Sequence, residues 1–312
     1  MVVQQQRSGG GARAACALAV VGVMAAAAGC SGSGGPGGFA IGGGGDRAVA
    51  DERDRSDGVE LIHRAAAVLA GTEAGDREAV DGSAEVRTSM ETAAGGTRVT
   101  ITGRGRYDFR TQLGRLTVVL PKDARGEAEH LPITELLAPG ALYMKNRGAG
   151  VPDDKWVRVD TTTLADGNLV TGGVTDPMAA AELLRGAREV TYVGKSELAG
   201  VTVRHYRGTA DLGRAARAAS PQSRGALAAA AKGFRTDAVP FDAYLDEAGR
   251  LRKVRHRFSF ANAGPAVEVV STTLLSGFGV PVDVRLPDDR DIYTGKIQQA
   301  GEGGGGGDGR GA

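Results

Sequence analysis

The chain has 312 residues, a nearly balanced charge and two cysteines, and these properties exclude several classes of protein. Its formal net charge is +1 at pH 7, without the marked basic excess that is usual in nucleic-acid-binding proteins. Glycine is abundant, at 50 residues, and aromatic residues make up only 4% of the chain. No segment after residue 30 is apolar enough to span a bilayer, which takes about 20 residues.

The first thirty residues have the organisation of an export signal. Arg7 and Arg13 form a basic start without acidic residues, and the apolar stretch AACALAVVGVMAAAA follows over residues 14–28. This stretch is too short to span a bilayer, so cleavage is expected after it. Residues 1–29 are therefore predicted to be a signal peptide, with Cys30 directly after it.

Cys30 is similar to the lipobox cysteine of bacterial lipoproteins, whose thiol receives a diacylglyceryl group. Ala28 and Gly29 fit that pattern, whereas Ala27 stands where leucine is preferred. The resemblance implies that Cys30 is lipidated and becomes the first residue of the mature chain. Paired acyl chains would then anchor the protein to the outer face of the membrane. The alternative is an ordinary secretory signal that contains a cysteine.

Loss of the signal leaves 283 residues, with 36 Lys and Arg against 37 Asp and Glu, because Arg7 and Arg13 leave with it. Cys30 is then the only cysteine, so no internal disulfide is possible. Residues 30–57 are predicted to be the lipidated cysteine and a flexible tether, and residues 299–312 a disordered glycine-rich tail. The folded part is predicted to span residues 58–298, as one β-rich domain or two small ones.

The folded part is expected to open with a helix that is capped by Asp57 and ends at Gly71. The clearest strand covers residues 98–109, where apolar residues and glycines alternate strictly with polar residues. That alternation indicates an antiparallel sheet with one covered face. Further strands are expected over residues 116–120, 141–145 and 155–160.

In the second half, a helix is expected from Asp176 to Gly186, and a helical region interrupted at Pro221 over residues 211–234. Strands are expected over residues 189–194, 201–209, 239–246, 251–260 and 266–275, with a β-like segment over 280–286. Strands and helices do not alternate regularly, so a parallel doubly wound fold is not expected. The pattern predicts an α+β fold, in which one strongly curled antiparallel sheet, a half-barrel, holds helices on its concave apolar face.

The segments ALYMK (residues 141–145) and KWVRVD (residues 155–160) resemble exported lipoproteins of actinobacteria. The resemblance is to the LppX and LprG type, within the wider LolA-like group, and covers most of residues 58–290 in order of elements. It implies a half-barrel around helices with an apolar cavity, in proteins that carry or sense lipids and lipoglycans at cell envelopes. Tyr143 and Trp156 carry over only as packing residues.

Glycines on the apolar face of the strand 98–109 indicate a candidate ligand site. Gly103 and Gly105 stand where bulky residues would normally fill the core, and strand glycines often mark a bend or the close approach of another group. One interpretation is a sharp curl of the sheet against a helix, and the other is space for an acyl chain. The predicted cavity lining is Val99, Ile101, Gly103, Gly105, Tyr107 and Phe109.

A basic run on the strand 251–260 is the second candidate feature. Lys253, Arg255 and Arg257 share one face of the strand. They are interpreted as a solvated convex face whose charges discourage edge pairing. The alternative is contact with anionic head groups, to which each Lys or Arg contributes about 1 kcal/mol.

The sequence shows no motif for catalysis, metal binding or a cofactor. Its four histidines are not at metal-ligand spacing, and a nucleophile elbow, a phosphate loop and a zinc signature are all missing. The sequence therefore predicts a membrane-anchored extracytoplasmic lipoprotein that binds a lipid or other amphiphile for carriage or handover, without a nucleic-acid partner. The alternative is a non-catalytic sensor or interaction module of the same fold that regulates an envelope protein. An enzyme is the third hypothesis.

Overall fold

The computed structural model describes residues 45–71, 82–94, 97–121, 131–148, 150–170, 174–260 and 267–295. The predicted signal, Cys30 and the predicted tail lie outside these residues. The chain divides into the units Met1–Val49 and Ala50–Ala312, and the fold below is that of the second unit.

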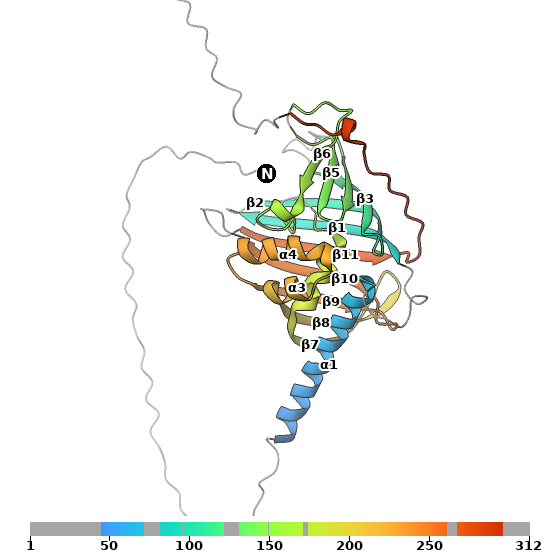
Figure 1. The fold of residues 1–312 in the computed structure, drawn as a ribbon. Coiled ribbons are helices and arrows are strands. Elements are labelled where there is room, and N and C mark those ends of the chain that lie inside the picture. The colour runs from blue at the N-terminus through green and yellow to red at the C-terminus, as the bar shows by residue number, and fades with distance from the viewer. Residues whose placement is uncertain are drawn as a thin grey trace, which may run out of the picture. The chain divides into compact units, whose positions relative to one another are not determined.

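An open antiparallel sheet of 11 strands forms the frame of the fold (Figure 1). The strands are β1 (Ser83–Ala94), β2 (Thr97–Asp108), β3 (Leu113–Val119), β4 (Ile133–Ala138), β5 (Ala141–Lys145), β6 (Val157–Asp160), β7 (Ala187–Leu198), β8 (Val201–Asp211), β9 (Ala238–Leu245), β10 (Leu251–Phe260) and β11 (Val267–Ser276). Their spatial order is β6-β5-β4-β3-β2-β1-β11-β10-β9-β8-β7. Pairing of β1 with β11 thus joins two meanders, and the predicted single curled sheet is confirmed.

Four helices accompany the sheet: α1 (Gly45–Leu69), α2 (Pro177–Leu183), α3 (Leu212–Ala218) and α4 (Pro221–Gly233). The Asp176 carboxylate caps α2 by accepting hydrogen bonds from the backbone N–H groups of Met178 (2.7 Å) and Ala179 (3.3 Å). Pro177 takes the first helical position, as predicted. The first helix ends before Gly71 as predicted, but it begins at Gly45 and not at Asp57, inside the segment predicted as a tether.

Two strands were not among those expected from the sequence, and one expected segment is not a strand. In β1 the inward residues Ala84, Val86 and Met90 alternate with polar ones, a signal that the sequence does contain. In β4 the inward series includes Glu135, which hides the alternation. The segment 280–286 has no regular secondary structure, so its β-like interpretation is wrong.

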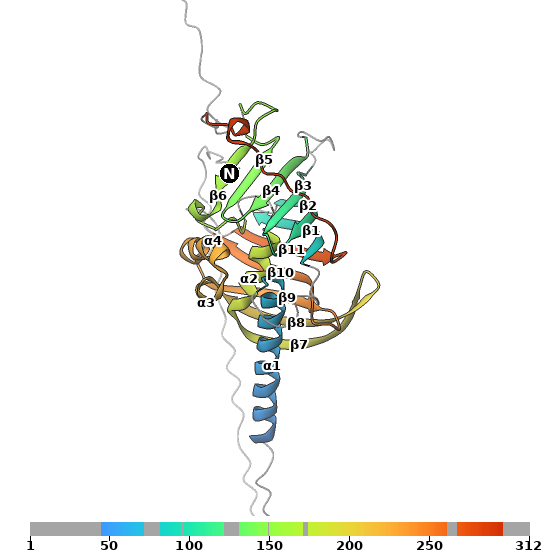
Figure 2. The ribbon, with the colours of Figure 1, turned by 45° about the vertical axis from the view of Figure 1, so that its right-hand side comes forward.

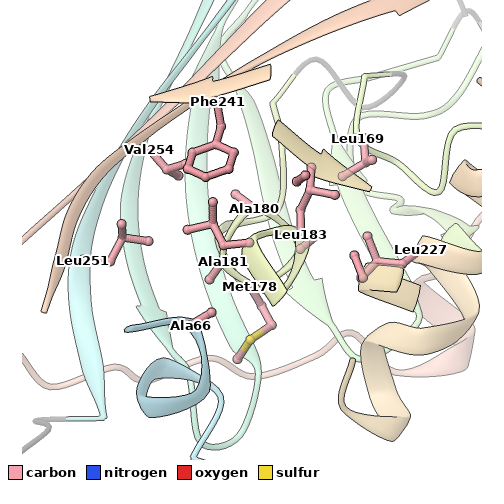
Figure 3. Packing of buried hydrophobic residues seen from close by; sticks show 14 of the residues in the cluster. Ala66, Leu169, Met178, Ala180, Ala181, Leu183, Leu227, Phe241, Leu251 and Val254 are labelled. Atoms are coloured by element: carbon pink, nitrogen blue, oxygen red, sulfur yellow. The ribbon is translucent and has the colours of Figure 1, made fainter. Parts of the chain in front are cut away.

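The helices α2, α3 and α4 lie on the concave face of the sheet (Figures 1 and 2). Figure 3 shows side chains of α2 between those of β9 and β10 and those of α1 and α4. Met178 and Leu183 of α2 are at most 1% exposed, as are Phe241 and Val254 of the facing strands. Burial of apolar surface stabilises such a contact by about 25 cal/mol per Å². The concave face is therefore a packed core.

The C-terminal segment 277–295 returns to the edge strand β6. The Trp156 N–H donates to the Asp291 carbonyl (2.8 Å), and the Tyr293 N–H donates to the Trp156 carbonyl (2.8 Å). Trp156 thereby forms a parallel bridge with Ile292. These bonds occupy backbone groups at the sheet edge, which would otherwise be open to pairing with another chain.

Gly105→Ala is expected to destabilise the fold. A Cβ atom at Gly105 would lie far inside contact distance of the Arg115 carbonyl on β3, where two strand backbones approach closely. Overpacking of this kind costs about 1–3 kcal/mol. The control Gly213→Ala adds a Cβ whose nearest neighbour is 3.4 Å away on α3. Urea unfolding should show a lower free energy of unfolding for Gly105→Ala and an unchanged one for Gly213→Ala. Equal free energies for the two variants would contradict the close approach of the β2 and β3 backbones at Gly105.

Candidate ligand site on the concave face

The predicted cavity lining divides into an exposed end and a buried end. Val99 is 38% exposed and Ile101 is partly buried, so this end of β2 does not lie in an enclosed interior. Tyr107 and Phe109 are each 1% exposed, and their ring centroids are 4.9 Å apart. The structure therefore brings together only the last two of these side chains as a tight aromatic pair.

The two glycines of the predicted lining have occupied surroundings. A Cβ atom at Gly103 would lie 2.6 Å from Thr88 Oγ1 and 3.1 Å from a methyl group of Val174. A Cβ atom at Gly105 would meet the backbone of β3. Both positions fit the interpretation of a curled sheet with close approach of neighbouring groups. The volume that a larger side chain at Gly103 or Gly105 would fill is therefore occupied by neighbouring groups and is not open space.

A group of four polar side chains lies in the middle of the concave face, which the sequence analysis did not identify. Thr88 on β1 is the register partner of Thr273 on β11, and Ser271 on β11 is the partner of His256 on β10. Their exposed fractions are between 1% and 4%. Neighbouring strands lie about 4.8 Å apart, so the four side chains are neighbours. We call these four residues the polar patch.

Three of the four side chains in the polar patch have an atom without a hydrogen-bond partner among the described residues. These atoms are Thr88 Oγ1, Thr273 Oγ1 and His256 Nε2. Burial lowers the pKa of His256 to about 3, so its ring is neutral at pH 7. Leaving a buried polar group unpaired costs about 1–3 kcal/mol. Such groups usually have a partner in a water molecule or a ligand.

Ser271, the fourth residue of the polar patch, is hydrogen-bonded to a segment that covers the patch. Thr175 Oγ1 donates to the Leu169 carbonyl (2.8 Å), so the Ser271 hydroxyl must donate in the 2.5 Å contact between Ser271 and Thr175. Val174 is 1% exposed and lies beside Gly103. We call residues 166–170 and 174–176 the covering segment. Among the described residues, the Thr175–Ser271 contact is the one side-chain hydrogen bond between this segment and the polar patch.

A small cavity of about 30 Å³ lies beside the covering segment. Tyr107, Asn168 and Asp176 are among its lining residues. Burial raises the pKa of Asp176, although hydrogen bonds from Met178, Ala179 and Tyr107 act in the opposite direction. A volume of this size holds about one water molecule. Ligand pockets measure about 300–1,000 Å³, so this cavity could not hold an acyl chain without movement of its walls.

Glu135 is a second buried polar group on the concave face. It lies on β4 opposite Leu116, it is 1% exposed, and neither carboxylate oxygen has a hydrogen-bond partner among the described residues. Burial raises the pKa of Glu135 to about 8, although nearby Arg147 acts to lower it. The side chain is therefore mostly neutral at pH 7. The sequence signal for it is a single acidic residue at an inward position of a short strand.

The basic run of β10 lies on the convex face. Arg257 Nη2 forms an ion pair with Asp242 Oδ2 (2.9 Å), and Lys253 Nζ lies 4.8 Å from the centre of the Tyr244 ring. Asp242 also accepts from His205 (2.8 Å) and Arg207 (3.0 Å). Strand β10 is paired on both sides, so protection of a sheet edge does not explain these charges.

Arg255, the remaining member of the basic run, is partly buried and has no ion pair with a described residue.

The histidines do not form a metal site in the part of the chain that the structure describes. His63 Nε2 lies 3.1 Å from the Ala187 carbonyl, and His130 lies outside the described residues. Within the described ranges, no three His, Cys, Asp or Glu side chains converge as metal ligands would. No described helix has both the length and the apolar character needed to cross a membrane.

These observations define an open, curled antiparallel half-barrel with helices on its concave face. Solved structures with some likeness include LprF from Mycobacterium bovis (12% identity, 74% of this chain, 97% of that chain, TM-score 0.40). The lipoprotein LppX from Mycobacterium tuberculosis has 11% identity over 77% of this chain and 99% of its own, with a TM-score of 0.37. The MucA/MucB complex from Pseudomonas aeruginosa has a chain with 14% identity, and the match covers 78% of this chain and 63% of that chain with a TM-score of 0.28.

No family model and no curated protein matches the sequence. With TM-scores below 0.5, the structural likenesses carry no argument about function.

Glu135 is expected to make stability fall as pH rises. Its pKa of about 8 in the folded protein exceeds the ordinary value of 4.5, so the folded state holds the proton more tightly between these values. This stabilisation is fully present below about pH 4.5 and is lost as pH rises toward 8, by at most about 1.4 kcal/mol per pH unit. Glu135→Gln removes the titration.

Urea unfolding at a series of pH values measures this effect. The free energy of unfolding of Glu135→Gln, relative to the unchanged chain, should rise steadily across the window. A difference that stays constant with pH would show that Glu135 does not titrate in this way.

Proposed function

We propose that the chain is a membrane-tethered extracytoplasmic lipoprotein whose domain binds an amphiphile between the concave face and the helices that cover it. The observation that carries the proposal is the polar patch, where three buried polar atoms that find no hydrogen-bond partner among the described residues lie in an apolar face. An amphiphile has an apolar part and a polar part, which match the apolar face and the polar patch. Its apolar chain replaces apolar contacts, and its polar group supplies the missing hydrogen bonds.

Binding requires the covering layer to move, because the cavity beside it measures only about 30 Å³. The covering elements are short: α2 and α3 have 7 residues each and α4 has 13. An acyl chain that takes their place on the sheet restores the apolar burial, at about 25 cal/mol per Å². The exchange is therefore nearly balanced in apolar contact, and the new hydrogen bonds at the patch favour the bound state.

The chemistry of the patch favours an uncharged polar group. Two threonine hydroxyls and a neutral imidazole can donate or accept hydrogen bonds, but they provide no positive charge. Burial of an anion without a counter-charge is far more costly than burial of a hydroxyl or an ester carbonyl. The proposed ligand is therefore a neutral amphiphile, or an acyl portion of a larger lipid or lipoglycan whose charged part stays outside.

The proposed location follows from Cys30, which lies outside the described residues. Lipidation there would hold the domain at the outer face of the membrane through two acyl chains. The second half of α1 is fixed to the domain, since Ile62, Ala65 and Ala66 are at most 2% exposed and His63 contacts the Ala187 carbonyl. The tether would thus deliver the domain to a membrane source of amphiphile for carriage or handover.

A second candidate function is a sensor or interaction module that regulates an envelope protein. The packed concave face favours it, because a filled interior needs no ligand to be complete. In this alternative the polar patch holds only water, and the covering layer stays closed.

Thr273→Val is expected to stabilise the domain while weakening binding. The substitution replaces an unpaired buried hydroxyl by a methyl group of similar shape, which removes a desolvation penalty of about 1–3 kcal/mol. It also removes one hydrogen bond to the ligand, so affinity for a fluorescent monoacylglycerol should fall roughly tenfold. The control Thr272→Val changes the next residue of β11, which is only partly buried, and should leave affinity unchanged.

The full chain with Cys30→Ala serves for these measurements, after organic extraction and mass spectrometry of the purified protein. The proposal expects extracted lipid and uptake of the probe. A protein without extractable lipid that also takes up neither monoacylglycerol nor fatty acid would instead favour the interaction module.

Cys30→Ala is also expected to release the protein from membranes. Without the thiol no diacylglyceryl group can be attached, and a protein without acyl chains loses stable anchoring. Fractionation of producing cells should move the variant from the membrane to the soluble extracytoplasmic fraction, whereas Cys16→Ala should remain with the membrane. Retention of Cys30→Ala in a high-salt wash would contradict the anchor.

A further inference from the structure

Four exposed arginines form a compact array on the convex face of β1, β2 and β3. Arg87 is the register partner of Arg104, and Arg106 is the partner of Arg115. Arg104 and Arg106 point to the same face because they are two residues apart on β2. With strands about 4.8 Å apart and residues about 3.4 Å apart along a strand, the four lie within roughly 15 Å of one another.

The charges of this array are not neutralised within the described chain. Arg87, Arg104 and Arg115 form no ion pair or hydrogen bond with described residues, and Arg106 donates only to the Pro281 carbonyl (3.3 Å). Glu85 is the register partner of Arg106 but forms no ion pair with it. Asp108 lies two residues after Arg106 on the same face of β2, and it forms an ion pair with Arg110 (3.8 Å). The array is thus a patch of exposed positive charge beside two carboxylates, those of Glu85 and Asp108.

The array opposes the stability of the sheet. Like charges directly opposite on neighbouring strands repel, and here two such pairs adjoin. Cations on a sheet often protect an exposed edge, but β1, β2 and β3 are each paired on both sides. Neither packing nor edge protection therefore accounts for these four residues, whereas an anionic partner would offset their repulsion.

We propose that this arginine array docks the domain onto an anionic membrane surface. The array is spread over one face of three strands, and the backbone of those strands is already paired, so a peptide could not add as a further strand. A surface of anionic head groups needs neither a groove nor free backbone. It can contact all four guanidinium groups, each raising affinity about fivefold.

The convex face contains further cations beside the array. Leu274 of β11 separates Arg87 from Lys253, and Arg255 lies next to Lys253 on β10. The head-group contacts predicted from the sequence thus lie on the same face, although Arg257 is held by Asp242. Docking by this face would turn the concave side, with its covering layer, away from the membrane. Docking uses the convex face alone and is independent of amphiphile binding at the concave face.

Vesicle co-sedimentation tests the proposal with the full chain carrying Cys30→Ala, so that no acyl chain contributes. Vesicles of phosphatidylcholine are compared with vesicles in which one third of the lipid is phosphatidylglycerol. Binding is expected only to the anionic vesicles and should weaken as salt is added. Arg87→Gln should reduce affinity about fivefold, and the combined change of all four arginines to glutamine should reduce it several hundredfold.

Arg214→Gln with Arg217→Gln is the control, because these exposed residues of α3 lie on the helical side of the sheet. This pair should change affinity less than twofold, whereas Arg87→Gln with Arg104→Gln should lower it about 25-fold. The fourfold variant should unfold at an equal or higher urea concentration, since it removes repulsion. Loss of vesicle binding would then not reflect loss of the fold.

Three results would overturn the proposal: equal binding to both kinds of vesicle, equal losses in the control and array variants, or stronger binding to soluble polyglutamate than to vesicles of equal charge. The last result would identify an acidic protein as the partner. Because monoacylglycerol uptake is measured separately, failure of membrane docking and failure of amphiphile binding can be told apart.

Discussion

The structure depends on one constraint, which is that the apolar concave face of an open sheet must be covered. A sheet that does not close on itself leaves this face to water unless other segments pack on it. Here the cover comes from the segments that connect β6 with β7 and β8 with β9, which include α2, α3 and α4. The Asp176 cap and the close approach of Val174 to Gly103 then follow from the need to fit this layer against the sheet, whereas the close approach at Gly105 is between two strands of the sheet itself.

The covered face contains polar groups that its cover does not satisfy. Thr88, Thr273 and His256 are buried as deeply as the apolar core, yet each has an atom without a hydrogen-bond partner in the part of the chain that the structure describes. A face that served packing alone would be more stable with apolar residues there. In the proposed function, the unsatisfied groups and the short covering elements form a binding site that is closed but costly to keep closed. On the convex face, the pairs Arg87–Arg104 and Arg106–Arg115 also lower the stability of the fold, because like charges repel.

Local signals in the sequence predicted much of the fold but not the site. Alternation predicted β2, and the Asp176-Pro177 pair predicted the start of α2, because both signals lie within a few neighbouring residues. The alternation of β4 was hidden by Glu135, and the packed state of the interior depends on side chains from distant segments. The polar patch and the arginine array each require the register between strands. Thr88 and Thr273 become neighbours only because β1 pairs with β11, which no short pattern can indicate.

Native-state hydrogen exchange can show whether the covering layer opens separately from the sheet, because it measures the free energy at which each segment opens. If the concave face binds an amphiphile, amides of α2, α3 and the covering segment should exchange through an opening that costs less free energy than global unfolding, while those of β1, β10 and β11 should not. Addition of monoacylglycerol should slow exchange in the covering layer. If the layer and the strands open only together, with or without the amphiphile, the concave face is a permanent core and not a binding site.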